Sequence, residues 1–258
     1  RSGRMNVVLA TVPGFSIGYV FDLALDELNR ALGTRGYALL VTRIQEEQEG
    51  LNLRELWGSV TPTLVLAMGG LPDHARRFIA MSQAPLIEDG GILSHVEMGR
   101  MQAEYLIGHG HARLAFGYPE DPSIDRYARQ RLEGVRAVCE EHELPAPVVG
   151  TVGTQLDAAM PVVEAWLAQR VTAVCGHNDD LALMVLTAVR SLGLEPGVDL
   201  SVMGVDDIPL AAMGLTTIAI STEVFTAAII ERVLAVLEDR EAVPVHQRAL
   251  RLVVRSSA

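Results

Sequence analysis

The feature of this sequence that most constrains its fold is the alternation of short apolar runs with amphipathic stretches along the whole chain. The apolar runs have the length of β-strands, and several are apolar throughout, as is typical of parallel strands covered by helices on both faces. Ten predicted strands lie near residues 6–12, 37–42, 63–68, 85–88, 113–117, 148–152, 171–175, 200–205, 216–220 and 249–254.

The stretches between these runs carry apolar residues at helical spacing. The clearest three sets are Phe21, Ala24, Leu25, Leu28 and Leu32, then Ala128, Leu132, Val135 and Cys139, and finally Ala182, Val185, Leu186, Val189 and Leu192. Gly33 and Gly36 are expected to close the first helix. Repeated βα units predict an open parallel α/β sheet, and about ten strands exceed what one strongly twisted sheet usually holds. The sequence therefore predicts two lobes, each a parallel sheet flanked by helices.

Composition limits the class of protein. The chain has 258 residues, of which 49% are hydrophobic, so it is not a disordered chain. Its net charge of −11 disfavours a surface that binds nucleic acid, and no apolar run approaches the ~20 residues of a membrane span. The two cysteines, Cys139 and Cys175, lie in separate apolar runs, and no export signal is visible at the start, so we expect a cytoplasmic protein.

Candidate binding residues follow from the strand positions, because ligands of open α/β sheets bind outside the carboxyl ends of the strands. Asn178-Asp179 and Asp206-Asp207 each come directly after an apolar run. For the first pair, two interpretations stay open: N-capping of the next helix, or Asn178 facing a ligand while Asp179 caps. For the second, one aspartate caps the following turn and the other faces a ligand, and the two side chains must diverge. Arg131, taken alone, is typical of a surface arginine.

Two other motifs are weaker. Gly14-Phe15-Ser16-Ile17-Gly18 matches the G-x-S-x-G pattern of a nucleophile elbow, but only one predicted strand precedes it, which favours a simple strand-to-helix loop. His109-Gly110-His111 lacks a nearby third ligand for a metal site and is interpreted as a helix end in which glycine supplies the turn. We therefore expect no metal, cofactor or catalytic residue.

The order of several segments resembles the lactose/galactose repressor family of bacterial transcription regulators. The effector-binding core of that family is similar to HNDDLALMVLTAVRSLGL at 177–194 and PGVDLSVMGVDDIP at 196–209. Further similar segments are RSGR at 1–4, GHARLAF at 110–116, RQRLEGVRA at 129–137, LTTI at 215–218 and RALRLVVRSSA at 248–258.

The resemblance implies a two-lobed fold of the type I periplasmic-binding-protein kind, with a small-molecule effector between the lobes. It implies a linker remnant at 1–5, an N-terminal lobe from 6–108 plus 223–240, and a C-terminal lobe from 109–220 plus 245–258. A homodimer is expected, with no membrane partner, and operator DNA would be bound only through a helix-turn-helix headpiece that precedes the chain.

The resemblance also assigns candidate effector-binding residues. They are Phe15, Ser16, Tyr19, Arg126, Arg131, Asn178 and Asp206. The chain departs from the family at 149–154, which lacks an aromatic residue that stacks on effectors, and at 90–98, which lacks the usual Asp-Asn pair. A sugar or related metabolite is thus only the default effector.

Three hypotheses about function remain at this stage. The first is the effector-sensing domain of a transcription regulator, which is not an enzyme. The second is a periplasmic solute-binding protein of a transporter, which shares the two-lobed fold. The third, a hydrolase with Ser16 as nucleophile, predicts ester turnover that is lost in Ser16→Ala.

Overall fold

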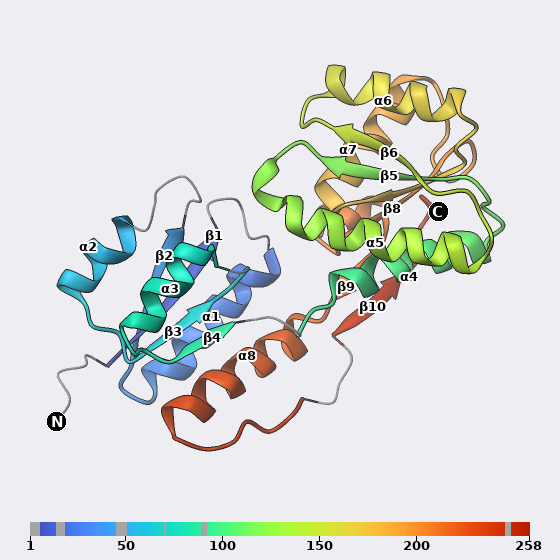
Figure 1. Cartoon of the computed structure of the whole chain (residues 1–258). Coiled ribbons are helices and arrows are strands. Elements are labelled where there is room, and N and C mark those ends of the chain that lie inside the picture. The colour runs from blue at the N-terminus through green and yellow to red at the C-terminus, as the bar shows by residue number, and fades with distance from the viewer. Residues whose placement is uncertain (1–5, 14–18, 45–50, 70, 89–91, 246–248) are drawn as a thin grey trace. The chain divides into compact units, whose positions relative to one another are not determined.

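The computed structural model of the chain describes residues 6–13, 19–44, 51–69, 71–88, 92–245 and 249–258 (Figure 1). The chain forms two compact units. The first comprises Arg1–Leu93 and Ser221–Ala249, and the second comprises Ser94–Ile220 and Leu250–Ala258. The predicted α/β class with two lobes is thereby confirmed. Among the described residues, no helix is long and apolar enough to cross a membrane.

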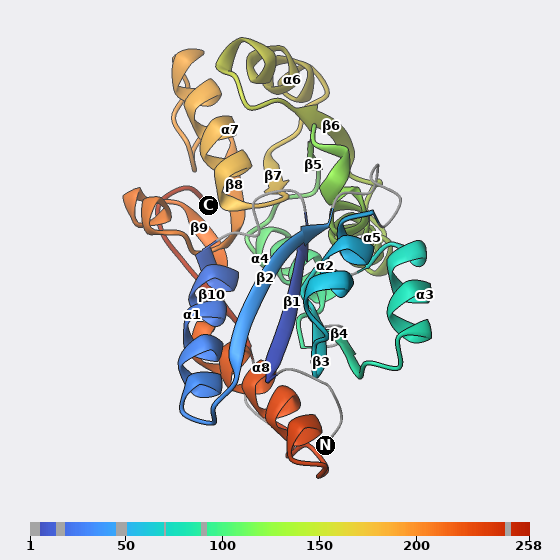
Figure 2. The ribbon, with the colours of Figure 1, turned by 90° about the vertical axis from the view of Figure 1, so that its left-hand side faces the viewer.

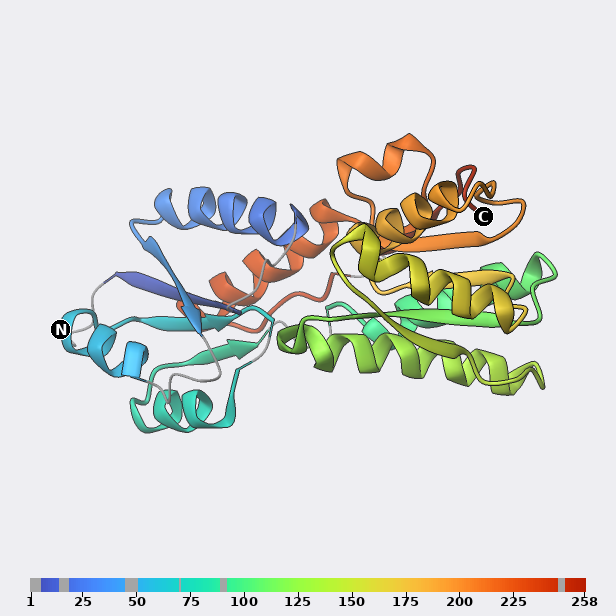
Figure 3. The ribbon, with the colours of Figure 1, turned by 90° about the horizontal axis from the view of Figure 1, so that it is seen from above.

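The first unit contains a four-stranded parallel sheet in the order β2-β1-β3-β4, whose strands are visible in Figure 2. Its strands are β1 (Val7–Pro13), β2 (Ala38–Ile44), β3 (Leu64–Ala67) and β4 (Leu86–Glu88). Its helices are α1 (Tyr19–Gly33), α2 (Leu51–Ser59), α3 (Asp73–Met81) and α8 (Thr222–Leu237). Figure 3 shows α1 and α8 on one face of this sheet and α3 on the other.

Apolar side chains fill both faces of this first sheet, as the apolar strands predict. On one face, the Phe21 ring of α1 and the Phe225 ring of α8 pack edge to face at 5.1 Å. On the other face, Trp57 of α2 packs against Phe78 of α3 at 5.3 Å. The core cluster on that second face consists of Leu9, Leu53, Val65, Ala67, Leu71, Ala75 and Ile79.

The second unit contains a six-stranded sheet in the order β10-β9-β8-β7-β5-β6. Its strands are β5 (Leu114–Pro119), β6 (Val148–Val152), β7 (Ala173–Gly176), β8 (Ser201–Asp206), β9 (Thr216–Ile220) and β10 (Leu250–Val253). Its helices are α4 (His95–Gly108), α5 (Asp125–Glu141), α6 (Leu156–Ala168) and α7 (Asp179–Ser191), with 3₁₀ turns η1 (Pro122–Ile124) and η2 (Pro209–Met213). Helices α6 and α7 cover one face of this sheet, and α4 and α5 cover the other (Figures 1 and 3).

All ten predicted strands are present, but one of them runs in the other direction. The pairing of β10 with β9 is antiparallel, whereas the other pairings in both sheets are parallel. The physical reason is that the chain returns to the second sheet beside the strand from which it left, since Leu250 is paired with Ile220. Periodicity alone does not encode this direction.

Helix α4 lies in the second unit, whereas residues up to 108 were expected in the first lobe. The helix packs closely against α5 through two glycines. A Cβ atom at Gly99 would overlap the carbonyl oxygen of Arg131, and a Cβ atom at Gly134 would overlap that of Val96. This backbone-to-backbone approach joins α4 to α5, a helix of the second unit, which begins at Ser94.

The last residues of the described chain are part of the second unit's core. The Ser257 hydroxyl donates to the Val202 carbonyl at 2.6 Å and accepts from the Thr216 backbone N–H at 2.9 Å. The Val202 N–H donates in turn to the Ser257 carbonyl at 2.7 Å. Residue 257 therefore ties β8 to β9 on the side of the sheet away from their carboxyl ends.

Candidate functional site

The carboxyl ends of β5, β7 and β8 form one edge of the second sheet, and three of the predicted site residues lie there. Asn178 follows β7, Asp206 ends β8, and Arg131 lies on α5, which begins after β5. Because α5 and α7 start at this edge, their unpaired backbone N–H groups and positive dipole ends lie there too. The edge therefore combines several oriented polar groups on rigid elements.

Arg131 is buried, with 5% of its surface exposed, so the interpretation as a surface arginine is wrong. Its guanidinium donates to the backbone carbonyl of His177 through Nη1 and to Nδ1 of His95 through Nε at 3.3 Å. Its Nη2 lies 3.9 Å from Oδ1 of Asp206. Burial lowers the pKa of Arg131, and the nearby Asp206 and Asp179 act in the opposite direction. The groups beside this cation are the His177 carbonyl, the imidazole of His95 at the start of α4, and the Asp206 carboxylate.

Asp206 has an uncommon backbone conformation, with φ of 114°, which costs energy in a residue that has a side chain. Its side chain is 27% exposed, so it can meet a molecule from solvent. Burial raises its pKa to about 6, and the Arg131 cation opposes that rise. The carboxyl group is thus held, at a strained strand end, beside a buried cation.

Asp207 points elsewhere, as the prediction of diverging side chains requires. Its carboxylate accepts from Arg255 at 2.8 Å and lies 3.9 Å from the Arg251 guanidinium. The expectation that one of the two aspartates caps the next turn is wrong, because η2 begins at Pro209 with Ile208 at its N-cap and no side-chain cap. The pairing with two arginines of the C-terminal segment explains the difference, since it takes the carboxylate away from the turn.

Asn178 caps helix α7, as one of the two open interpretations predicts. Its Oδ1 accepts from the backbone N–H of Leu181 at 3.0 Å. Its side-chain NH₂ group makes no hydrogen bond with any residue that the structure describes. Asn178 can therefore cap with its oxygen and still donate to a ligand with its nitrogen.

Asp179 has a structural role that was not predicted from the sequence. Its carboxylate is fully buried and accepts from the Thr217 hydroxyl at 2.6 Å and from the Ile208 N–H at 2.9 Å. Burial raises its pKa to about 7, although both hydrogen bonds oppose the rise. A Cβ at residue 204 would overlap this carboxylate, so Gly204 in the middle of a strand was the signal that a neighbour approaches closely.

Two histidines at this edge were also missed. The pKa of His95 is lowered to about 3 by burial and by the positive charges of Arg131 and Arg126. His177 is 5% exposed, its pKa is lowered well below the usual value by burial, and its Nδ1 is buried without a hydrogen-bond partner among the described residues. Scattered histidines have no pattern in the sequence, so only their positions in the fold distinguish these two.

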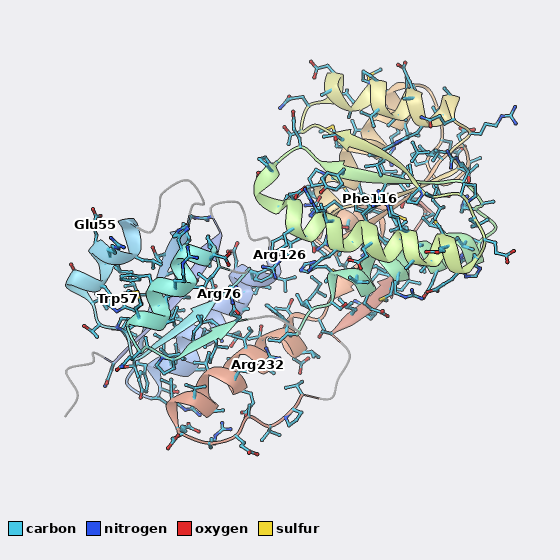
Figure 4. All side chains as sticks on the ribbon, viewed as in Figure 1. Glu55, Trp57, Arg76, Phe116, Arg126 and Arg232 are labelled. Carbon is cyan, nitrogen blue, oxygen red and sulfur yellow. The ribbon has the colours of Figure 1, made fainter. Side chains whose placement is uncertain are left out.

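The remaining predicted residues are placed less fully. Arg126 is exposed on the first turn of α5, where Figure 4 labels it. Tyr19 begins α1 in the first unit, and Phe15 and Ser16 lie outside the described residues. The His109 to His111 segment is a helix end, as predicted, because α4 ends at Gly108 and Gly110 has φ of 91°.

The chemistry of the assembled groups suits the binding of a polar molecule. A buried guanidinium, a partly exposed carboxyl and an unused amide NH₂ can together donate to and accept from hydroxyl groups. Within the described ranges, no three His, Cys, Asp or Glu side chains are arranged to hold a metal ion. Hydrogen bonds to backbone atoms orient Arg131 and Asn178, and the Asp206 carboxylate lies 3.9 Å from the Arg131 guanidinium.

Comparison with known proteins identifies relatives over much of the chain. A family model described as the periplasmic binding protein-like domain matches residues 103–258. The ribose operon repressor of Escherichia coli strain K12 is 29% identical over 217 residues, which are 74% of this chain and 63% of the repressor. The arabinose metabolism transcriptional repressor of Geobacillus stearothermophilus is 30% identical over 131 residues, which are 46% of this chain and 35% of that protein.

The chain thus spans between about a third and two thirds of the length of these two relatives. Among solved structures, it is similar to a sugar-binding transcriptional regulator of the LacI family from Escherichia coli complexed with phosphate. That similarity has a TM-score of 0.80 at 18% sequence identity and covers 99% of each chain. It confirms the predicted type I fold.

Proposed function

Since the chain belongs to the periplasmic binding protein-like domain family, we propose that it is the effector-sensing domain of a bacterial transcriptional regulator. A small polar molecule, by default a sugar, binds at the carboxyl edge of the second sheet through Arg131, Asn178 and Asp206. Binding changes the affinity of the complete regulator for operator DNA. The regulator acts as a cytoplasmic homodimer, and the first unit adds contacts from Phe15, Ser16 and Tyr19.

The observation that carries this proposal is the relation between Arg131 and Asp206. Their charged groups are 3.9 Å apart, which is too long for a hydrogen bond. Both groups therefore retain hydrogen-bonding capacity that hydroxyl groups of a ligand can use. The unused NH₂ group of Asn178 adds a donor at the same edge, from the start of α7.

The function requires no chemical step. An effector shifts a regulator between two states only by as much as its affinities for those states differ, typically about 1–3 kcal/mol. The groups at the sheet edge give the ligand different affinities for the two states of the regulator if the ligand completes their hydrogen bonds in only one of those states.

A thermal-shift screen of sugars, sugar phosphates, nucleosides and amino acids tests the proposal. A ligand at ~100 times its dissociation constant should raise the free energy of unfolding by about 2.7 kcal/mol. The stabilisation should fall sharply in Asp206→Asn, which keeps the shape of the side chain, and persist in Glu133→Gln, an exposed position on the outside of α5. A ligand that stabilises both variants equally would contradict the site assignment.

Two further outcomes would contradict the function itself. The first is a screen in which no compound stabilises the chain. The second is hydrolysis of activated esters that disappears in Ser16→Ala, because it would identify an enzyme.

A further inference from the structure

Charge is distributed unevenly along the carboxyl edge of the second sheet. Asp179, Asp180 and Asp206 lie where β7 and β8 end. Arg126 and Arg131 lie on α5, which covers the opposite side of that edge. The edge therefore has three aspartates after β7 and β8 and two arginines on α5, a helix that itself begins with Asp125, and Arg131 lies 3.9 Å from Asp206 across the edge.

Arg126 differs from its neighbour on the same helix. Arg129 pairs with Asp125, with Nε and Oδ2 at 2.6 Å. Arg126 forms no hydrogen bond or ion pair with any residue in the described ranges, and its charge still reaches His95 strongly enough to lower the pKa of that imidazole. A guanidinium close to the site thus has all of its donors available.

His95 supplies a second available donor. Because a guanidinium can only donate, the bond from Nε of Arg131 requires that Nδ1 of His95 be the acceptor. A neutral imidazole with a bare Nδ1 carries its proton on Nε2, and the low pKa of His95 keeps it neutral at physiological pH. The ring is held against Tyr127, with centroids 4.7 Å apart. Its Nε2–H has no partner in the described part of the chain.

We propose that the effector carries an anionic group, a carboxylate or a phosphate, which Arg126 and the Nε2–H of His95 bind while Asp206 binds its hydroxyl groups. This inference rests on the proposed sensing function and names the ligand class of the same site. The first turns of α4 and α5, where His95 and Arg126 lie, add the positive ends of two helix dipoles. A neutral sugar would bring no negatively charged acceptor to Arg126.

Matched pairs of ligands test the proposal by isothermal titration calorimetry. The probes are glucose, gluconate and glucose 6-phosphate, together with galactose and galacturonate, and ribose and ribose 5-phosphate. At least one anion should bind about tenfold or more tightly than its neutral parent, as expected for one charge-assisted hydrogen bond. The carboxylate and phosphate arms identify which anion the site prefers.

Variants then locate the anion. Arg126→Gln should abolish the preference for the anion with little effect on the neutral parent, and Arg129→Gln should leave the preference unchanged. His95→Gln, which keeps an acceptor for Arg131 and an N–H donor, should retain most of the preference, and His95→Leu should lose it.

The outcomes separate this inference from the proposed function. Neutral sugars that bind as tightly as their acids, in a manner sensitive to Asp206→Asn, would overturn the anion assignment and leave the sensing function intact. A preference for anions that survives Arg126→Gln would overturn the assigned position. Failure of every pair to bind overturns the inference, and the broad thermal-shift screen then decides the proposed function independently.

Discussion

Replacing Asp179 with asparagine should remove a pH dependence of stability that this carboxyl group imposes on the second unit. The group is fully buried, and its pKa rises from 3.8 in the unfolded chain to about 7 in the folded one. Between these values the folded state holds a proton that the unfolded state has released. The resulting stability is fully present below pH 3.8 and is lost as the pH rises through 7.

The magnitude follows from the two pKa values. They differ by about three units, and one unit is worth about 1.4 kcal/mol, so the whole window corresponds to at most about 4 kcal/mol. About 2 kcal/mol of this should be lost between pH 5 and pH 7. The asparagine can accept from the Ile208 N–H and donate to the Thr217 hydroxyl, which is free to rotate, so the variant should fold.

Urea unfolding followed by tryptophan fluorescence measures the effect in the relevant unit. The chain has two tryptophans, and Trp166 is buried in the second unit, whereas Trp57 lies in the first. A Trp57→Phe background leaves fluorescence that reports on the second unit alone. His95 and His177, whose lowered pKa values act in the opposite direction below pH 6.5, are common to both proteins.

The decisive quantity is the difference in unfolding free energy between the Asp179 protein and the asparagine variant. We expect this difference to change by about 2 kcal/mol in favour of the variant from pH 5 to pH 7. A difference that stays constant over this range would refute the assignment of a raised pKa to Asp179.

Three other predictions concern residues of the second unit. In urea titrations, Ser257→Ala should lower the free energy of unfolding by about 1–3 kcal/mol, because a backbone N–H of β9 and a carbonyl of β8 lose their partner. The control Ser256→Ala, at an exposed position, should change the free energy of unfolding by less than about 0.5 kcal/mol. Gly99→Ala should lower the free energy of unfolding by about 1–3 kcal/mol, since the added methyl group displaces Arg131. It should also weaken effector binding measured by calorimetry, and normal binding would contradict the role of the α4–α5 contact. Asn178→Asp should keep the helix cap and stability but reduce effector affinity, and unchanged affinity would show that the amide NH₂ is not used.

Much of the fold was predictable because it depends on local patterns. All ten strands and the helices around Leu28, Val135 and Val185 were indicated by apolar spacing, which reflects burial on both faces of a sheet. The position of Asn178 and Asp206 at one sheet edge followed from the rule that parallel strands end together. The antiparallel direction of β10 did not, because it depends on where the chain returns.

The electrostatics of the site depend on contacts between distant segments and could not be predicted from spacing. Arg131 is buried beside groups from three other segments, the start of α4, the end of β7 and the end of β8. The buried carboxylate of Asp179 depends on a glycine in β8 and a hydroxyl in β9. Each feature joins residues that are far apart in sequence, so no single motif contains it.

The interleaved chain path has a consequence for inheritance. The first unit is completed by α8, whose segment leaves the second sheet after Ile220 and returns at Leu250, with the Ser221 N–H bonded to the Ala249 carbonyl at 2.7 Å. Peeling β10 away would release the returning end of that segment, while its other end stays attached to β9, and would raise the entropic cost of holding α8 against α1. Recombination between genes would need three breakpoints to transfer the first unit whole, so the two halves of such a protein are inherited together.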